Sequence, residues 1–232
     1  MTAGLRHLLA AFAIYLGVGA AAAPAQVAPS EAELAAYTGL HRAAATGDIA
    51  AIRQAGKDKT LLDARDAYGR TPLMVAAYAQ QVDAAKALVA AGADLDALDR
   101  DRYDVVTIAS VADDVGILEL VLSAGAKPGQ TTSPYDGTAL IAAAHLGHVG
   151  VVKTLIAAGA PLDHVNNLNW TALIESIVLG DGGPNHFACL TALVEAGADV
   201  NIADGNGVTP LQLARRHGYD EMVRILKAAG AK

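Results

Sequence analysis

Two histidines near the middle of the chain, His145 and His148, are three residues apart and could in principle share a metal ion. Gly147 stands between them, where a turn between two helices is expected. A zinc site needs three or four protein ligands, and no third ligand lies near in the sequence. We therefore predict no metal site here and expect both histidines to be structural.

Five aspartates between residues 94 and 104 have the acidic character of a calcium-binding loop. Such a loop needs an oxygen donor at its fifth position, a glycine at its sixth and a glutamate at its twelfth. Those positions hold Leu98, Asp99 and Val105. The mismatch favours a solvated turn over a calcium site. The aspartates are Asp94, Asp96, Asp99, Asp101 and Asp104.

A glycine-rich segment, Gly180 to Pro184, and the single cysteine, Cys189, are the remaining candidates for chemistry. A phosphate-binding loop needs a lysine and a preceding strand, and this segment has neither, so we expect a long loop between two helices. Cys189 is expected to be a buried small hydrophobic residue. No serine lies in a Gly-x-Ser-x-Gly setting and no nucleophile–base pair is evident. The sequence therefore predicts no enzyme and no cofactor.

The composition of the 232 residues predicts an all-α protein. Hydrophobic residues make up 53% of the chain and aromatic residues only 4%, because the chain holds 52 alanines. Alanine is the strongest helix former and lets helices pack closely. The net charge of −7 argues against nucleic acid as a partner, which requires a basic face. One cysteine excludes an intramolecular disulfide framework.

Residues 1–25 have the pattern of a secretory signal peptide. Arg6 precedes a run of sixteen apolar or glycine residues, Leu8 to Ala23, which is shorter than the roughly 20 needed to span a bilayer. A small-x-small site, Ala23-Pro24-Ala25, predicts cleavage after Ala25. The protein is therefore expected in the periplasm or secreted, without a membrane contact after cleavage.

The rest of the chain is organised by a repeat of about 33 residues. Threonines at 38, 71, 138, 171 and 209 are 33, 67, 33 and 38 residues apart, and prolines follow two of them, as Thr71-Pro72 and Thr209-Pro210. Glycines at 92, 125, 159, 197 and 230 recur in phase with them. Proline is tolerated in the first turn of a helix, so each Thr-Pro predicts a helix start. A glycine at the end of a second helix is typical of a left-handed cap. Such helix pairs bury their apolar faces only by stacking, which predicts a solenoid.

These motifs resemble those of the ankyrin-repeat family, whose signature is Thr-Pro-Leu-His-x-Ala. Asp66 to Leu73 and Val151 to Ala160 carry the resemblance most specifically. It implies an ankyrin-repeat solenoid of about six helix–turn–helix units joined by β-turn or hairpin loops, over residues 38–232. Residues 26–37 are expected to form a linker or capping helix, because Ser30 and Glu33 have capping-box spacing. The units are expected near 34–65, 66–98, 99–132, 133–165, 166–203 and 204–232.

The resemblance also implies that a partner docks on the concave face, made of turn tips and first helices. Tyrosine, tryptophan and arginine are typical interface anchors, and five of the eight aromatic residues that follow the leader fall at such positions. We therefore expect exposed anchors along this face. The predicted partner-binding residues are Tyr68, Arg70, Tyr78, Arg100, Tyr103, Tyr135, His145, Trp170, Leu179 and Arg216.

The sequence thus predicts a non-enzymatic, monomeric, exported protein that binds another protein. Two alternatives stay open. One is an accessory or regulatory subunit of a periplasmic enzyme, with stress defence as one setting. The other is a small-ligand binder or enzyme with a site around Asp104, His145 and Asp181. The double variant Tyr103→Ala/Trp170→Ala is expected to lose the partner with little change in melting temperature.

Overall fold

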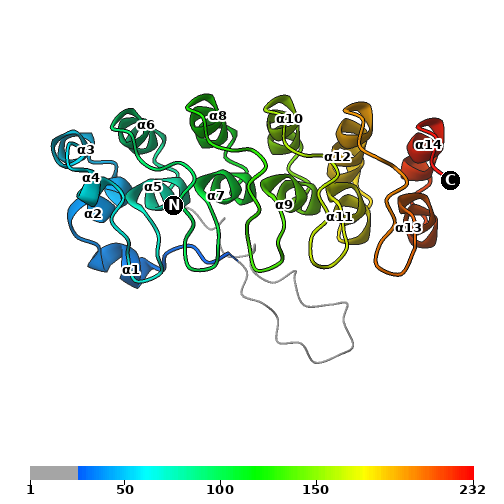
Figure 1. Cartoon of the computed structure of the whole chain (residues 1–232), viewed down its shortest axis with the longest axis horizontal. Helices are drawn as coiled ribbons and strands as arrows, with labels where there is room; N and C mark the ends of the chain where they lie inside the picture. Colours follow the sequence, from blue (N-terminus) through cyan, green and yellow to red (C-terminus); the bar gives the residue numbers. More distant parts are fainter. Residues whose placement is uncertain (1–25) are drawn as a thin grey trace.

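The computed structural model describes residues 26–232, and the signal peptide predicted for residues 1–25 lies outside this part. Within residues 26–232 the chain forms α-helices and no β-strand, apart from one isolated bridge between Thr132 and Gly137. The helices stack side by side into an elongated array (Figure 1). The prediction of an all-α solenoid is confirmed.

Six helix pairs make up the array, in two rows (Figure 1). The first helix of each pair lies in an inner row beside the long loops, and the second lies in an outer row. The inner helices are α2 (Gly39–Thr46), α5 (Pro72–Tyr78), α7 (Val105–Val111), α9 (Ala139–Leu146), α11 (Ala172–Val178) and α13 (Pro210–His217). The outer helices are α3 (Ile49–Ala55), α6 (Val82–Ala90), α8 (Val115–Ser123), α10 (Val149–Ala157), α12 (Pro184–Glu195) and α14 (Asp220–Ala228).

The repeated threonines begin the inner helices. The hydroxyls of Thr71, Thr138, Thr171 and Thr209 each accept a hydrogen bond from the backbone N–H three residues on. Pro72 and Pro210 occupy the first helical position, where no N–H is needed. In the third pair Asp104 takes the place of threonine, and its carboxylate accepts from the Thr107 N–H at 2.7 Å.

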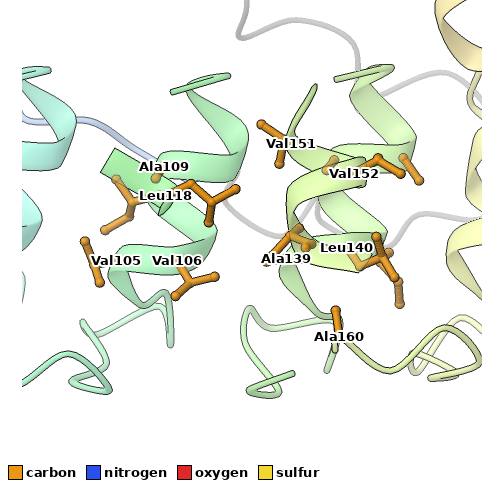
Figure 2. Close-up of a cluster of buried hydrophobic side chains, with 14 of the residues drawn as sticks. Val105, Val106, Ala109, Leu118, Ala139, Leu140, Val151, Val152 and Ala160 are labelled. Carbon is orange, nitrogen blue, oxygen red and sulfur yellow. The ribbon is translucent and has the colours of Figure 1, made fainter. Parts of the chain in front are cut away.

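Small residues let the inner helices stack closely. Ala109, Ala139 and Ala144 are fully or almost fully buried, and the branched side chains of the neighbouring pairs fill the space around them. Figure 2 shows this cluster of buried side chains in the middle of the array, with Val105 and Val106 from α7, Ala139 and Leu140 from α9, and Val151 and Val152 from α10. The apolar core therefore runs along the whole array instead of being concentrated in one centre.

The long loops between pairs are built on one repeated device, a polar side chain that caps its own turn. Asp66 Oδ1 accepts hydrogen bonds from the backbone N–H groups two and four residues on, at 2.8 Å each. Asp99, Asn166 and Asp204 do the same in their own loops. Asp99 of the acidic segment 94–104 thus serves its own turn, but the prediction of a solvated turn is wrong for Asp104, which is buried where it caps α7.

Two additional helices lie at the N-terminal end. α1 (Glu31–Ala36) begins with the predicted capping box, in which Ser30 and Glu33 exchange hydrogen bonds. The short α4 (Lys59–Leu62) occupies the place where the other pairs have Gly-Ala. None of the helices in residues 26–232 is long and apolar enough to cross a membrane.

Candidate functional site

The candidate binding face consists of the loop tips 66–70, 99–103, 133–137, 166–170 and 204–208 together with the inner helices. Neighbouring tips are joined by backbone hydrogen bonds. The N–H of Arg100 donates to the Tyr68 carbonyl at 2.9 Å, and the N–H of Asn167 donates to the Tyr135 carbonyl at 2.9 Å. The N–H of Ser133 donates to the Arg102 carbonyl at 3.0 Å. The first four tips therefore form one hydrogen-bonded, preorganised edge of the molecule.

Exposed anchors on this edge are fewer than the sequence suggested. Tyr68 is 51% exposed, and Arg100 and Arg216 are also exposed. Arg102 forms a half-exposed ion pair with Asp136 of the next tip at 2.7 Å. Tyr78, Tyr135, His145, Trp170 and Leu179 are only partly exposed.

Two predicted anchors, Arg70 and Tyr103, are not exposed, and the expectation of exposure was wrong for them. Arg70 is 2% exposed and Tyr103 is 7% exposed. Both are the fifth residue of a tip, whose N–H donates back to the aspartate that begins the turn. The Arg70 side chain is enclosed by Asp66, Tyr68 and Glu33 of α1, and the Tyr103 side chain packs in the apolar core. Trp170 has the same position and packs against the core as well.

The burial of Tyr103 changes which variants can test binding. Tyr103 belongs to the apolar core, so Tyr103→Ala would disturb the fold together with any contact to a partner. The Tyr103→Ala/Trp170→Ala variant therefore does not separate binding from stability. Tyr68 and Arg100, which are exposed at adjoining tips, are suitable positions for that purpose.

Arg70 instead ties α1 to the second tip. Its guanidinium donates to Glu33 Oε1 at 2.6 Å and to Asp66 Oδ2 at 2.7 Å. The Tyr37 hydroxyl donates to the same Asp66 oxygen at 2.7 Å. Burial acts to raise the pKa of Asp66, but these bonds, from Tyr37 first and then from Arg70, hold that pKa below its ordinary value. The group is a buried ionic cluster that anchors the N-terminal helix.

A buried polar cluster on the inner helices was missed by the sequence analysis. Glu175 of α11 is 3% exposed, and its carboxylate lies 3.1 Å from His145 Nδ1 and accepts a hydrogen bond from Asn166 Nδ2 at 3.1 Å. The signal in the sequence was a lone glutamate in the apolar helix Ala172–Val178. The partners of Glu175 come from the preceding unit and its own tip.

His145 and His148, the two histidines considered as metal ligands, contact helices on opposite sides of their own unit. His145 faces Glu175 on α11, whereas His148 Nδ1 lies 2.9 Å from the Ser110 carbonyl on α7. In residues 26–232 no group of three or more His, Cys, Asp or Glu side chains is arranged to hold a metal ion. Cys189 is buried, as expected, and burial raises the pKa of its thiol to about 11.

The three residues of the alternative ligand site have separate structural roles. Asp104 caps α7 through Thr107. Asp181 belongs to the loop before α12, where its Oδ1 lies 2.8 Å from His186 Nδ1. The other ring nitrogen of His186 lies 2.9 Å from the His145 carbonyl, so this histidine fixes the inserted loop to α9. The His145 side chain contacts Glu175, so each of the three residues has a partner of its own in the fold.

Comparison with known proteins was made for the sequence and for the structure. A family model described as ankyrin repeats (3 copies) matches residues 14–99 and 106–204, and another described as ankyrin repeats (many copies) matches residues 183–228. The ankyrin repeat protein YahD of Escherichia coli (strain K12) is 35% identical over 191 residues, which cover 82% of this chain and 94% of that protein.

A solved ankyrin repeat domain from Acinetobacter baumannii AYE is 48% identical in sequence. The match has a TM-score of 0.79 and covers 83% of this chain and 98% of that domain. The nuclear factor NF-kappa-B p105 subunit of Gallus gallus is 30% identical over 175 residues, which cover 74% of this chain and 17% of that much longer protein.

Proposed function

Because the chain belongs to the ankyrin-repeat family, we propose that it is a non-enzymatic protein that binds another protein through its tips and inner helices. Ankyrin repeats are generally protein–protein interaction modules. The observation that carries the proposal is the edge of four hydrogen-bonded tips, which presents Tyr68 and Arg100 at adjoining tips. A rigid edge loses little conformational entropy on binding, which favours affinity.

The chemistry of the edge favours a partner surface with both apolar and acidic groups. Tyr68 offers a large flat ring, and the buried Arg70 guanidinium lies 4.5 Å from its centroid, which holds the ring in place. Arg100 supplies an exposed positive charge at the next tip. Electrostatic groups of this kind select the partner more than they add affinity.

The setting of this function is part of the same proposal. The leader pattern of residues 1–25 supports export to the periplasm or beyond. A monomer is expected, because the charged helices α13 and α14 close the C-terminal end of the array. An accessory subunit of a periplasmic enzyme would use the same face. Such a subunit would differ from a simple binding module because it would change the activity of the enzyme that it binds.

Affinity capture with two matched variants tests the proposal. The full chain is immobilised beside Tyr68→Ala/Arg100→Ala and beside Arg224→Ala, which removes an exposed arginine from the outer helix α14. We expect one partner to be retained by the wild type and by Arg224→Ala, and its affinity to fall about tenfold or more in the tip variant. The melting temperatures of the three chains are expected to differ only by the small contribution of the contact between Tyr68 and Arg70. Equal retention by all three would contradict a role of the tips.

A further inference from the structure

A basic groove lies on the side of the molecule opposite the tips, between the outer helices α3 and α6. Its volume is about 810 Å³. Its apolar lining consists of Ile49 from α3 and of Ala87, Ala90 and Ala91 from α6 and its C-terminal end. The lining also has four basic side chains and one acidic side chain: Arg53, Lys57, Lys59, Lys86 and Asp83.

This concentration of positive charge is unusual for the chain. The protein carries 24 acidic and 17 basic side chains, yet four of the basic ones line one groove. Arg53 and Lys86 occupy equivalent positions, 33 residues apart, on α3 and α6. The next equivalent position, on α8, is Glu119, so the basic character ends after the second pair.

The departure of the first unit from the repeat pattern builds the groove. The α4 helix replaces the usual Gly-Ala turn and is fixed to the second unit at two points. Lys59 Nζ donates to the Gly92 carbonyl at 2.8 Å, and Asp63 Oδ1 accepts from the Asp94 N–H at 2.8 Å. The buried Gly56 keeps α3 close to α6, because a Cβ at this position would lie 3.0 Å from Ala91 Cβ.

The basic side chains are not all used within the fold. Lys59 offsets the negative C-terminal end of α6 through its bond to Gly92. Lys86 pairs with Asp83 at 3.3 Å, but both side chains are more than half exposed, so this pair contributes little. Arg53 and Lys57 are exposed and have no ion pair within residues 26–232. Their charges are available to a ligand.

We propose that this groove is a second binding site, which takes an acidic, partly apolar segment of a partner protein. The carboxylates of such a segment would pair with Arg53, Lys57 and Lys86, and its apolar side chains would contact Ile49 and the alanines. A small inorganic anion would pair with the charged side chains but would leave the apolar lining uncovered. The site is separate from the tips, so a partner could contact both sides or two partners could bind at once.

Fluorescence anisotropy with a labelled peptide of alternating glutamate and leucine tests this site, with the glutamine–leucine peptide as the neutral probe. The full chain is expected to bind the acidic peptide, with an affinity that falls as salt is added. Arg53→Glu/Lys86→Glu is expected to weaken binding about tenfold or more, whereas Lys153→Glu/Arg224→Glu, which changes the net charge equally on α10 and α14, is expected to weaken it less than about threefold.

Three results would contradict the proposal that the groove binds an acidic segment. They are equal weakening by both charge reversals, equal binding of the neutral peptide, and no binding of the acidic peptide by the wild-type chain. Melting temperatures of both variants check that the fold is kept. Tyr68→Ala/Arg100→Ala is expected to bind this peptide like the wild type, so failure of the groove is distinguishable from failure of the tips.

Discussion

Arg70→Ala is expected to lower the free energy of unfolding by about 3–5 kcal/mol, the usual cost of removing one partner from a buried ion pair. The guanidinium is almost fully enclosed and bonds to Glu33 and Asp66 at once. Its loss leaves the Asp66 carboxylate, itself only 8% exposed, without its cation. It also removes the ionic link that holds α1 against the second tip, so α1 is expected to detach before the rest of the array unfolds.

Urea unfolding at neutral pH measures this cost, and Arg102→Ala is the matched control. Arg102 also pairs with an aspartate at 2.7 Å, but its pair is half exposed, and such pairs are worth at most about 1 kcal/mol. Arg70→Lys is expected to recover only part of the stability, because an ammonium group does not reproduce the two-pronged geometry of the guanidinium. A loss below about 1 kcal/mol in Arg70→Ala would contradict the anchoring role of the cluster.

Asp104→Thr is expected to stabilise the protein by up to about 3 kcal/mol at pH 8 and by much less at pH 4. Burial raises the pKa of Asp104 from 3.8 to about 6. The Asp104 carboxyl group therefore binds its proton more tightly in the folded state than in the unfolded state. As a result, the free energy of unfolding falls as the pH rises from about 4 to about 6, and it stays lower above that range. Threonine caps four of the other inner helices and carries no charge.

Thermal or urea unfolding between pH 4 and pH 8 measures the effect of Asp104→Thr. Asp48→Thr is the control, because Asp48 caps α3 in the same manner but is exposed. It is expected to change stability by less than about 1 kcal/mol at either pH. A neutral or destabilising effect of Asp104→Thr at pH 8 would contradict the claim that the ionised carboxylate destabilises the folded state.

The repeated elements of the fold were predictable because each depends on a local rule. Thr71 and Pro72 begin a helix through their own hydroxyl and ring. Gly92 and Gly125 have positive φ angles of 85° and 105°, as the left-handed cap requires. The capping box of Ser30 and Glu33 involves residues only three apart. Short-range patterns of this kind determine the structure with little help from the surroundings.

The orientation of the tip side chains was not predictable in the same way. Position within the repeat placed Arg70 and Tyr103 at the tips, but Arg70 is buried by its contacts with α1 and Asp66, and Tyr103 packs in the core. The partner of Arg70 on α1, Glu33, is 37 residues away in sequence, and the partner of Glu175 on α9, His145, is 30 residues away. Such contacts arise only when neighbouring units stack, and no local pattern encodes them.

Photo-cross-linking from single positions tests the central claim, that the tips contact a partner protein, most directly. A photoreactive phenylalanine analogue replaces Tyr68 or Arg100 at the tips, or Lys153 on the outer helix α10, in the full chain expressed in its own cells. We expect the same protein to be cross-linked from both tip positions and not from position 153. Cross-links from position 153 alone, or from none of the three positions, would contradict binding through the tips.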